Sequence, residues 1–199
     1  RPYNVHELID AIIDADSFLE VQKDFAQELV VGFARLDGKV VGVVANQPAV
    51  KGGAIFPESA DKGANFVWTC DAYNIPLLYL CDTPGFMVGS RVEQDGILRR
   101  GRNFIYASSM ATVPKMCVVV RKAYGAGIYA MAGPAYDPDT TIALPSAEIA
   151  IMGPEAAINA VYFNKLAAIE DPKEKAQTIQ KLRDEYRAGY DIYKLASDL

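Results

Sequence analysis

The segment from Ile75 to Leu80 contains no charged side chain and is apolar at nearly every position. A run of this length fits a β-strand, and successive side chains of a strand point to opposite faces of its sheet. This strand must therefore be covered on both faces, as in parallel sheets that carry helices on either side. The segment predicts a layered α/β fold.

The surrounding sequence repeats an alternation of strands and helices. Leu29–Leu36 and Lys39–Asn46 are rich in β-branched residues, and Asp37-Gly38 between them favours a tight hairpin turn. Apolar spacing predicts helices at 5–15, 60–72, 93–109 and near 125, and a second buried strand at 115–120. From Glu155 the pattern is helical, and Pro172 fits a helix start.

These elements predict an α/β fold with a mixed, mostly parallel sheet, crossover helices and a helical C-terminal arm. The repeated unit of two strands and a helix is typical of the crotonase-like (ClpP/crotonase) fold. Periodicity alone leaves a Rossmann-type sheet open as well.

Composition excludes several functional classes. The 199 residues carry a net charge of -5, so the basic surface that nucleic acids require is not expected. The apolar runs are far shorter than the roughly 18 residues of a membrane span. Cys70, Cys81 and Cys117 are widely spaced, which predicts buried thiols in a reducing compartment, either the cytoplasm or a mitochondrial matrix. The chain starts at Arg1 without Met, and we expect residues 1–199 to be one domain of a longer subunit.

Motifs for the common catalytic machineries are missing. The single histidine, His6, lies in the first predicted helix and far from any nucleophile elbow, so we interpret it as a surface residue. The sequence contains neither a phosphate-binding loop nor a dinucleotide fingerprint. Spacing typical of metal ligands is also missing, and no metal is expected.

Two glycine-bearing turns follow the two buried strands, at the strand ends where open α/β sheets bind ligands. The first is Asp82–Phe86, and a plain Pro-Gly turn is its simplest interpretation. The second is Arg121–Met131, whose small residues serve close packing equally well. Free backbone N–H groups at such a turn can bind an oxygen that carries negative charge.

Together these turns resemble the carboxyltransferase (β) subunits of biotin-dependent acyl-CoA carboxylases, the propionyl- and methylcrotonyl-CoA carboxylase family. The resemblance covers nearly the whole chain. It rests on the order of these short segments: 2–5 (PYNV), 31–35 (VGFAR), 44–48 (VANQP), 82–86 (DTPGF), 97–101 (ILRRG), 111–115 (ATVPK), 121–125 (RKAYG) and 145–153 (PSAEIAIMG).

The resemblance implies that this chain is the C-terminal, carboxybiotin-side domain. Such a domain is half of a carboxyltransferase that moves a carboxyl group from carboxybiotin to the α- or γ-carbon of an acyl-CoA. The backbone N–H groups of Ala126 and Gly127 would be the catalytic donors that stabilise negative charge on the ureido oxygen. Gly125 would permit close approach, and Pro84, Gly85 and Phe86 would line the biotin channel.

The resemblance also places residues near the acyl-CoA: Asn46, Gln47, Gly52, Gly53 and Tyr129. Tyr129 stands where propionyl-CoA carboxylases have an Asp associated with acyl-chain selection, so their substrate choice does not transfer directly. The implied cofactor is biotin on a partner carrier, with a CoA thioester as substrate.

The implied partners are the N-terminal carboxyltransferase half, the biotin carboxylase and biotin carrier subunits, and further copies in a dimer to hexamer. Three other interpretations remain open. A sodium-pumping acyl-CoA decarboxylase shares the same half-site. A crotonase-type hydratase or isomerase would need a carboxylate base, for which Glu148 and Asp82 are the candidates. A purely oligomerising domain would keep the fold alone.

Overall fold

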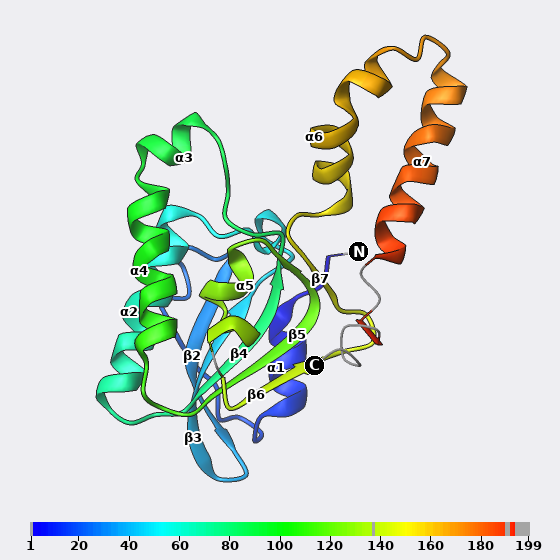
Figure 1. Cartoon of the computed structure of the whole chain (residues 1–199). Coiled ribbons are helices and arrows are strands. Elements are labelled where there is room, and N and C mark those ends of the chain that lie inside the picture. Colours follow the sequence, from blue (N-terminus) through cyan, green and yellow to red (C-terminus); the bar gives the residue numbers. More distant parts are fainter. Residues whose placement is uncertain (1, 137, 190–191, 194–199) are drawn as a thin grey trace.

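A computed structural model describes residues 2–136, 138–189 and 192–193. These residues form an α/β domain in which a twisted sheet lies between helices (Figure 1). The elements are, in chain order, α1 Val5–Ile12, β1 Leu19–Val21, β2 Leu29–Leu36, β3 Lys39–Asn46, η1 Lys51–Gly53, α2 Pro57–Ala72, β4 Leu77–Thr83, α3 Ser90–Gln94, α4 Ile97–Met110, β5 Lys115–Tyr124, α5 Gly127–Ala130, η2 Pro134–Tyr136, β6 Thr140–Ala143, β7 Glu148–Ala150, α6 Pro154–Ala167 and α7 Pro172–Ala188.

The sheet has seven strands in the order β1-β2-β3-β4-β5-β6, and β7 pairs with the far end of β5. The β2–β3 hairpin is antiparallel and turns at Asp37-Gly38, where both residues have positive φ angles. From β3 onward every pairing is parallel. The predicted mixed, mostly parallel sheet is confirmed.

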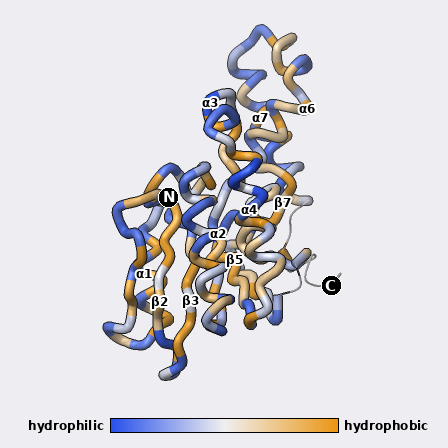
Figure 2. Tube along the Cα trace, turned by 90° about the vertical axis from the view of Figure 1, so that its left-hand side faces the viewer, coloured by the Kyte–Doolittle hydropathy of each residue, from blue (hydrophilic) through white to orange (hydrophobic). Residues whose placement is uncertain are grey.

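The core divides into one apolar layer on each face of the sheet. Alternation along the strands separates them: Tyr79 faces α2 and α4, whereas Leu78 and Leu80 face α1. Figure 2 shows the hydrophobic strands β2 and β3 beside α1. α2 and α4 pack closely because Gly63 leaves room for the Phe104 ring, which a Cβ at residue 63 would meet at 2.5 Å. This contact holds the helical layer tightly over the sheet.

Several boundaries differ from those expected. The first helix ends at Ile12 rather than near 15, because Asp14 turns back to accept hydrogen bonds from the hairpin amides of Asp37 and Gly38. The helix expected at 93–109 is two helices, α3 and α4, separated at Gly96 by a left-handed φ of 85°. The helix expected near 125 has only four residues.

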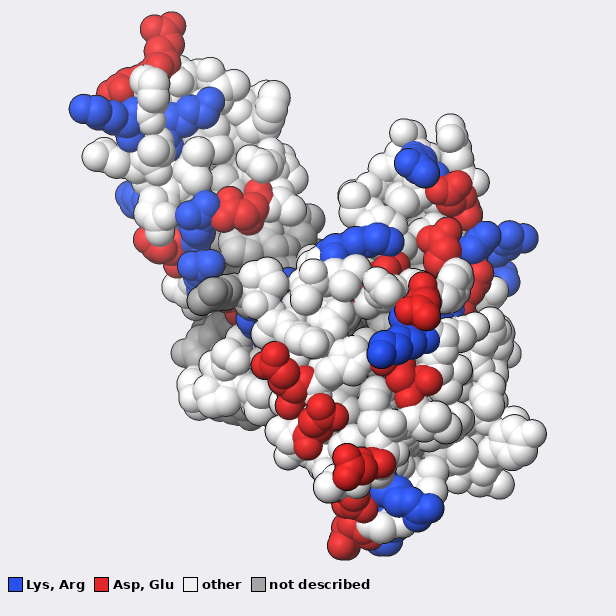
Figure 3. All heavy atoms as spheres, turned by 180° about the vertical axis from the view of Figure 1, so that it is seen from behind, with Lys and Arg blue, Asp and Glu red and all other residues white. Residues whose placement is uncertain are grey.

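The predicted C-terminal helical arm is present and projects from the sheet as the α6–α7 hairpin (Figure 1). It has a small core of its own, formed by Ile158, Leu166 and Leu182. On the face shown in Figure 3, acidic and basic side chains are mixed, without a continuous basic area. No helix among the described residues is long and apolar enough to span a membrane.

Candidate functional site

The two predicted turns meet in space. Gly127 lies directly against Gly85, since a Cβ built on Gly127 would come within 2.8 Å of both the Gly85 Cα and the Thr83 Cγ2. Gly85 itself has a φ of 110°, and its Cβ would lie 3.1 Å from the Tyr124 carbonyl oxygen. Any larger residue would push the segments apart, so both glycines serve a close backbone approach.

The amides of Ala126 and Gly127 are available as donors. Within the described part of the chain, neither donates to a protein acceptor, although their carbonyls accept from Ala130 and Met131. The Gly125 amide, by contrast, donates to the Ala150 oxygen at 2.9 Å. Because α5 is a single turn, these donors act as local N–H dipoles rather than through a long helix dipole.

The sequence did not predict a role for the backbone amide of Phe86, a residue that lines the same cavity as Ala126. Ile55 pairs alongside it, donating to the Gly85 oxygen at 3.0 Å and accepting from the Met87 amide at 2.8 Å. Successive residues of an extended segment turn their N–H groups to alternate sides, so the Phe86 amide faces away from Ile55. No sequence signal marks this pairing, because Ile55 is about thirty residues from Phe86 and lies outside any named strand.

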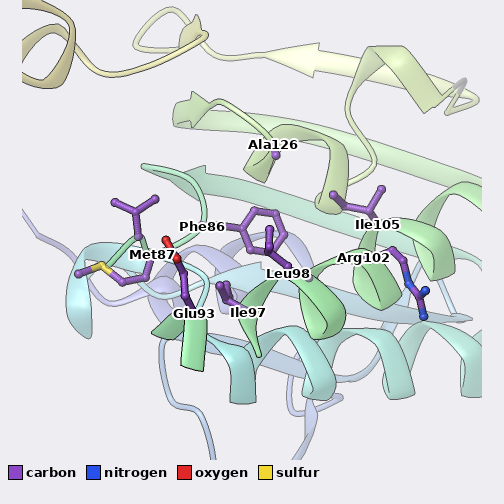
Figure 4. Close-up of a pocket in the computed structure, with 10 residues that line it drawn as sticks. Phe86, Met87, Glu93, Ile97, Leu98, Arg102, Ile105 and Ala126 are labelled. Carbon is purple, nitrogen blue, oxygen red and sulfur yellow. The ribbon is translucent and has the colours of Figure 1, made fainter. Parts of the chain in front are cut away.

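An apolar cavity of about 470 Å³ opens between this turn and α4 (Figure 4). Ala126 and Phe86 both line it, and in the close-up Leu98, Ile97 and Ile105 surround the Phe86 ring. Glu93 and Arg102 are the charged residues in its wall. The remaining lining residues are Met87, Val88 and Gly101. The cavity thus combines apolar walls with Ala126, whose amide donates to no acceptor among the described residues.

Other residues named for the biotin and acyl-CoA sites are distributed more widely. Pro84 is exposed beside Gly85. Gln47 is buried and binds the first helix, where its Oε1 accepts from the Val5 amide at 3.1 Å and its Nε2 donates to Asn4 at 2.7 Å. Gln47 therefore stabilises the start of α1 and is not among the residues that line the cavity, and its place near the acyl-CoA stays a prediction.

Tyr129 and Gly52 line two separate cavities. Tyr129 packs edge-on against Tyr136 beside an apolar space of about 550 Å³. Gly52 borders a polar space of about 420 Å³ that also includes Arg121 and Lys122. Gly53 is buried under the Asp82 carbonyl.

Neither carboxylate considered as a catalytic base is free. Glu148 accepts a hydrogen bond from the Tyr124 hydroxyl, and burial together with this carboxylate raises the pKa of Tyr124. Asp82 is 1% exposed and contacts Arg121 at 3.1 Å. A general base must reach its substrate proton, so the hydratase or isomerase interpretation loses both its candidates. Among the described residues, no group of His, Cys, Asp and Glu has the arrangement of metal ligands.

Comparison with known proteins shows which family the chain resembles. Residues 1–198 match the family described as the carboxyl transferase domain. The chain is 57% identical over its full length to an uncharacterized carboxylase, YngE, of Bacillus subtilis, of which it covers 39%. It is 45% identical to a propionyl-CoA carboxylase carboxyltransferase subunit of Haloferax mediterranei, with 96% of this chain and 37% of that protein covered.

Among solved structures, the transcarboxylase 12S hexamer with methylmalonyl-CoA bound aligns with a TM-score of 0.86 and 41% identity, over 99% of this chain and 38% of that one. The transcarboxylase 12S structure has the crotonase-like fold, so this chain has that fold and not the Rossmann-type sheet that periodicity had left open. The chain spans well under half the length of the relatives it matches.

Proposed function

The chain belongs to the carboxyl transferase domain family, and from this premise we propose that it forms the biotin side of a site that transfers a carboxyl group between biotin and an acyl-CoA. The observation that carries the proposal is the contact of Gly85 with Gly127 beside the apolar cavity, which gathers unbonded amides at one end of a space suited to a small bicyclic ring.

The cavity fits the chemistry of biotin. Its apolar walls suit the ring system, and the amides at its end suit the ureido oxygen. Biotin, when bound, carries the carboxyl group on a ring nitrogen, and that nitrogen serves as a base once the carboxyl group has left. The Ala126 and Gly127 amides stabilise the charge that grows on the ureido oxygen. Fixed donors of this kind lower the barrier because they are oriented before charge develops.

Carboxyl transfer of this type uses no side-chain base from this domain. The carboxyl carrier and the base would both be supplied by biotin, and this domain would contribute the amide donors of Ala126 and Gly127 that hold its ureido oxygen. The only histidine, His6, bonds Glu20 at 2.8 Å and is not among the residues that line the cavity. Backbone donors therefore suffice for the part that this domain contributes.

We further propose that the remaining machinery resembles that of the relatives. Residues 1–199 would act as the C-terminal domain beside an N-terminal carboxyltransferase half, served by biotin carboxylase and a biotin carrier. The transcarboxylase 12S is a hexamer, and a homo-oligomer is expected here too. A reducing compartment suits the buried thiols.

The direct test uses the complete natural subunit, with methylmalonyl-CoA as carboxyl donor and biocytin as acceptor. We expect carboxybiocytin to form, and replacing Gly127 by Pro, which deletes an amide donor, to abolish its formation. His6→Ala is the control, expected to retain activity. Undiminished transfer by Gly127→Pro, or no transfer by the unsubstituted protein with any acyl-CoA, would contradict the proposed function.

A further inference from the structure

The pairing of β4 with β5 changes register just before the site. From Leu77 opposite Lys115 to Cys81 opposite Val119 the strands advance together, but Thr83 then lies opposite Ala123. Continued pairing would have placed Thr83 opposite Arg121, so β5 contains two additional residues at this point. At about 3.3 Å per residue, the shift moves everything after it on β5 by roughly 6–7 Å relative to β4.

Asp82 is the residue of β4 that faces the irregularity. Its side chain accepts from the backbone amide of Lys122 at 3.3 Å, which replaces the ladder hydrogen bond lost at the bulge. Its carboxylate also accepts from Arg121 Nε at 3.1 Å and lies 3.7 Å from Lys122 Nζ. Two cations and a backbone donor balance a carboxylate that is 1% exposed, and a buried charge is tolerated only with such partners.

Asp82 also connects β4 and β5 to a third segment, which runs from Asn46 to Gly53. The Asp82 amide donates to Asn46 Oδ1 at 3.1 Å, at the end of β3. Lys122 Nζ donates to the Gly52 oxygen at 3.3 Å, and a Cβ on Gly53 would lie 2.5 Å from the Asp82 oxygen. Asp82 therefore connects the segment around Asn46–Gly53, its own turn and the turn that carries the donors.

The position of the donors depends on this connection. Gly85 follows Asp82 by three residues and Gly127 follows Lys122 by five, and these glycines touch only because Thr83 is opposite Ala123. With the uninterrupted register, Gly127 would slide past Gly85 by two residues. Ala126 and the adjoining Gly127 amide would then no longer lie beside the cavity that Ala126 lines together with Phe86.

We infer that Asp82 is a positioning residue of the carboxyl-transfer site: through the Lys122 amide and Arg121 it sets the β4–β5 register that brings Gly127 against Gly85. The inference rests on the proposed function. Asp82 acts through the strands and does not touch the reacting atoms.

The test compares Asp82→Asn with the unsubstituted protein in the complete subunit, using methylmalonyl-CoA and biocytin. The carboxamide removes the charge that holds Arg121, so we expect kcat to fall about 10- to 100-fold, as misplaced catalytic groups do, with KM for methylmalonyl-CoA nearly unchanged. A crystal structure of the variant should show Thr83 no longer opposite Ala123.

The matched control is Asp71→Asn. Asp71 also holds a loop, accepting from the Thr112 amide at 2.6 Å, but it lies at the opposite ends of the strands. Its loss should lower stability and leave kcat unchanged. If Asp82→Asn does not fold, Arg121→Gln takes its place, with a smaller fall in kcat and the same unchanged KM.

An Asp82→Asn protein that keeps either the normal kcat or the Thr83–Ala123 pairing overturns the inference, and so does an Arg121→Gln protein of normal kcat where it stands in. If the unsubstituted protein transfers no carboxyl group, the proposed function fails, and the strand pairing in the variant structure still decides whether Asp82 sets the register.

Discussion

At the scale of single residues, the site is built from places where a side chain is missing. Gly85 and Gly127 allow two turns to touch, and Gly53 passes beneath the Asp82 carbonyl. In the proposed function the backbone amides beside this contact provide the chemistry, whereas Asp82 is bonded to Arg121 and Glu148 to Tyr124. Substitution of a glycine is therefore the sharpest probe of the site.

Gly127→Ala should damage both stability and transfer. The new Cβ would lie 2.8 Å from backbone and side-chain atoms of the neighbouring turn, and such overpacking costs about 1–3 kcal/mol of unfolding free energy. Denaturant unfolding and the biocytin assay measure the two effects. Gly38→Ala is the control: its φ of 75° makes it mildly destabilising, but nothing lies within 4 Å and kcat should not change. Normal kcat in Gly127→Ala would show that the contact is dispensable.

At the scale of elements, the α6–α7 arm is a separate packing unit. Its helices meet through Ile158, Leu166 and Leu182, and an ion pair of 2.6 Å joins Glu155 to Arg183. The Tyr186 hydroxyl reaches back to the Met152 oxygen at 3.2 Å. With so small a core, the arm should open more readily than the sheet.

Asp171→Ala should loosen α7 alone. Asp171 caps the helix by accepting from the Lys173 amide at 2.9 Å, and loss of such a cap costs about 0.5–2 kcal/mol. Hydrogen exchange should become faster at α7 amides, with the strands unaffected. The adjacent Glu170→Ala makes no cap and should stay within about 0.5 kcal/mol of the natural protein. Equal acceleration in the strands would mean that the arm and the sheet unfold together.

At the scale of the whole molecule, one continuous apolar layer lies between the sheet and helices α2 and α4, and it contains all three cysteines. Burial raises the pKa of Cys70 and Cys117 to about 12, and raises that of Cys81 as well. A thiol reacts as its thiolate, so these side chains should be inert in the folded protein.

Stability should fall as the pH rises from about 9 to about 12. Over that interval the thiols of the unfolded chain ionise while the folded ones keep their protons, so deprotonation favours unfolding. Urea titrations across this range, together with iodoacetamide labelling, measure the effect. Cys70→Ala should show a weaker pH dependence because one of these thiols is gone. Rapid labelling of the natural protein at about pH 8 would contradict the burial of the thiols.

Local signals predicted many elements. Asp37-Gly38 identified the hairpin, and Pro172 marked the start of α7. Both signals depend on backbone preferences of one or two residues, which act without help from distant parts of the chain. The break at Gly96 was missed because a glycine within a helical pattern does not reveal whether it adopts a left-handed φ.

The candidate site was predicted in part. The turns at 82–86 and 121–131 were identified as a pair, and they do meet. The bonds of Gln47 to Val5 and Asn4 were not foreseen, because nothing in its neighbours shows them, and its place near the acyl-CoA stays a prediction. The roles of Ala126 and Gly127 in binding biotin stay predictions.

The sequence by itself determined the class of fold, the hairpin, the helical arm and the family, because these follow from periodicity, turn residues and ordered short motifs. Only the tertiary structure decided that Asp82 lies at the register shift between β4 and β5 and that Ile55 pairs alongside Phe86. It also decided that Asp82 is bonded to Arg121 and Glu148 to Tyr124. The reason is physical: strand register and burial arise from contacts between residues far apart in the chain, and no local pattern encodes them.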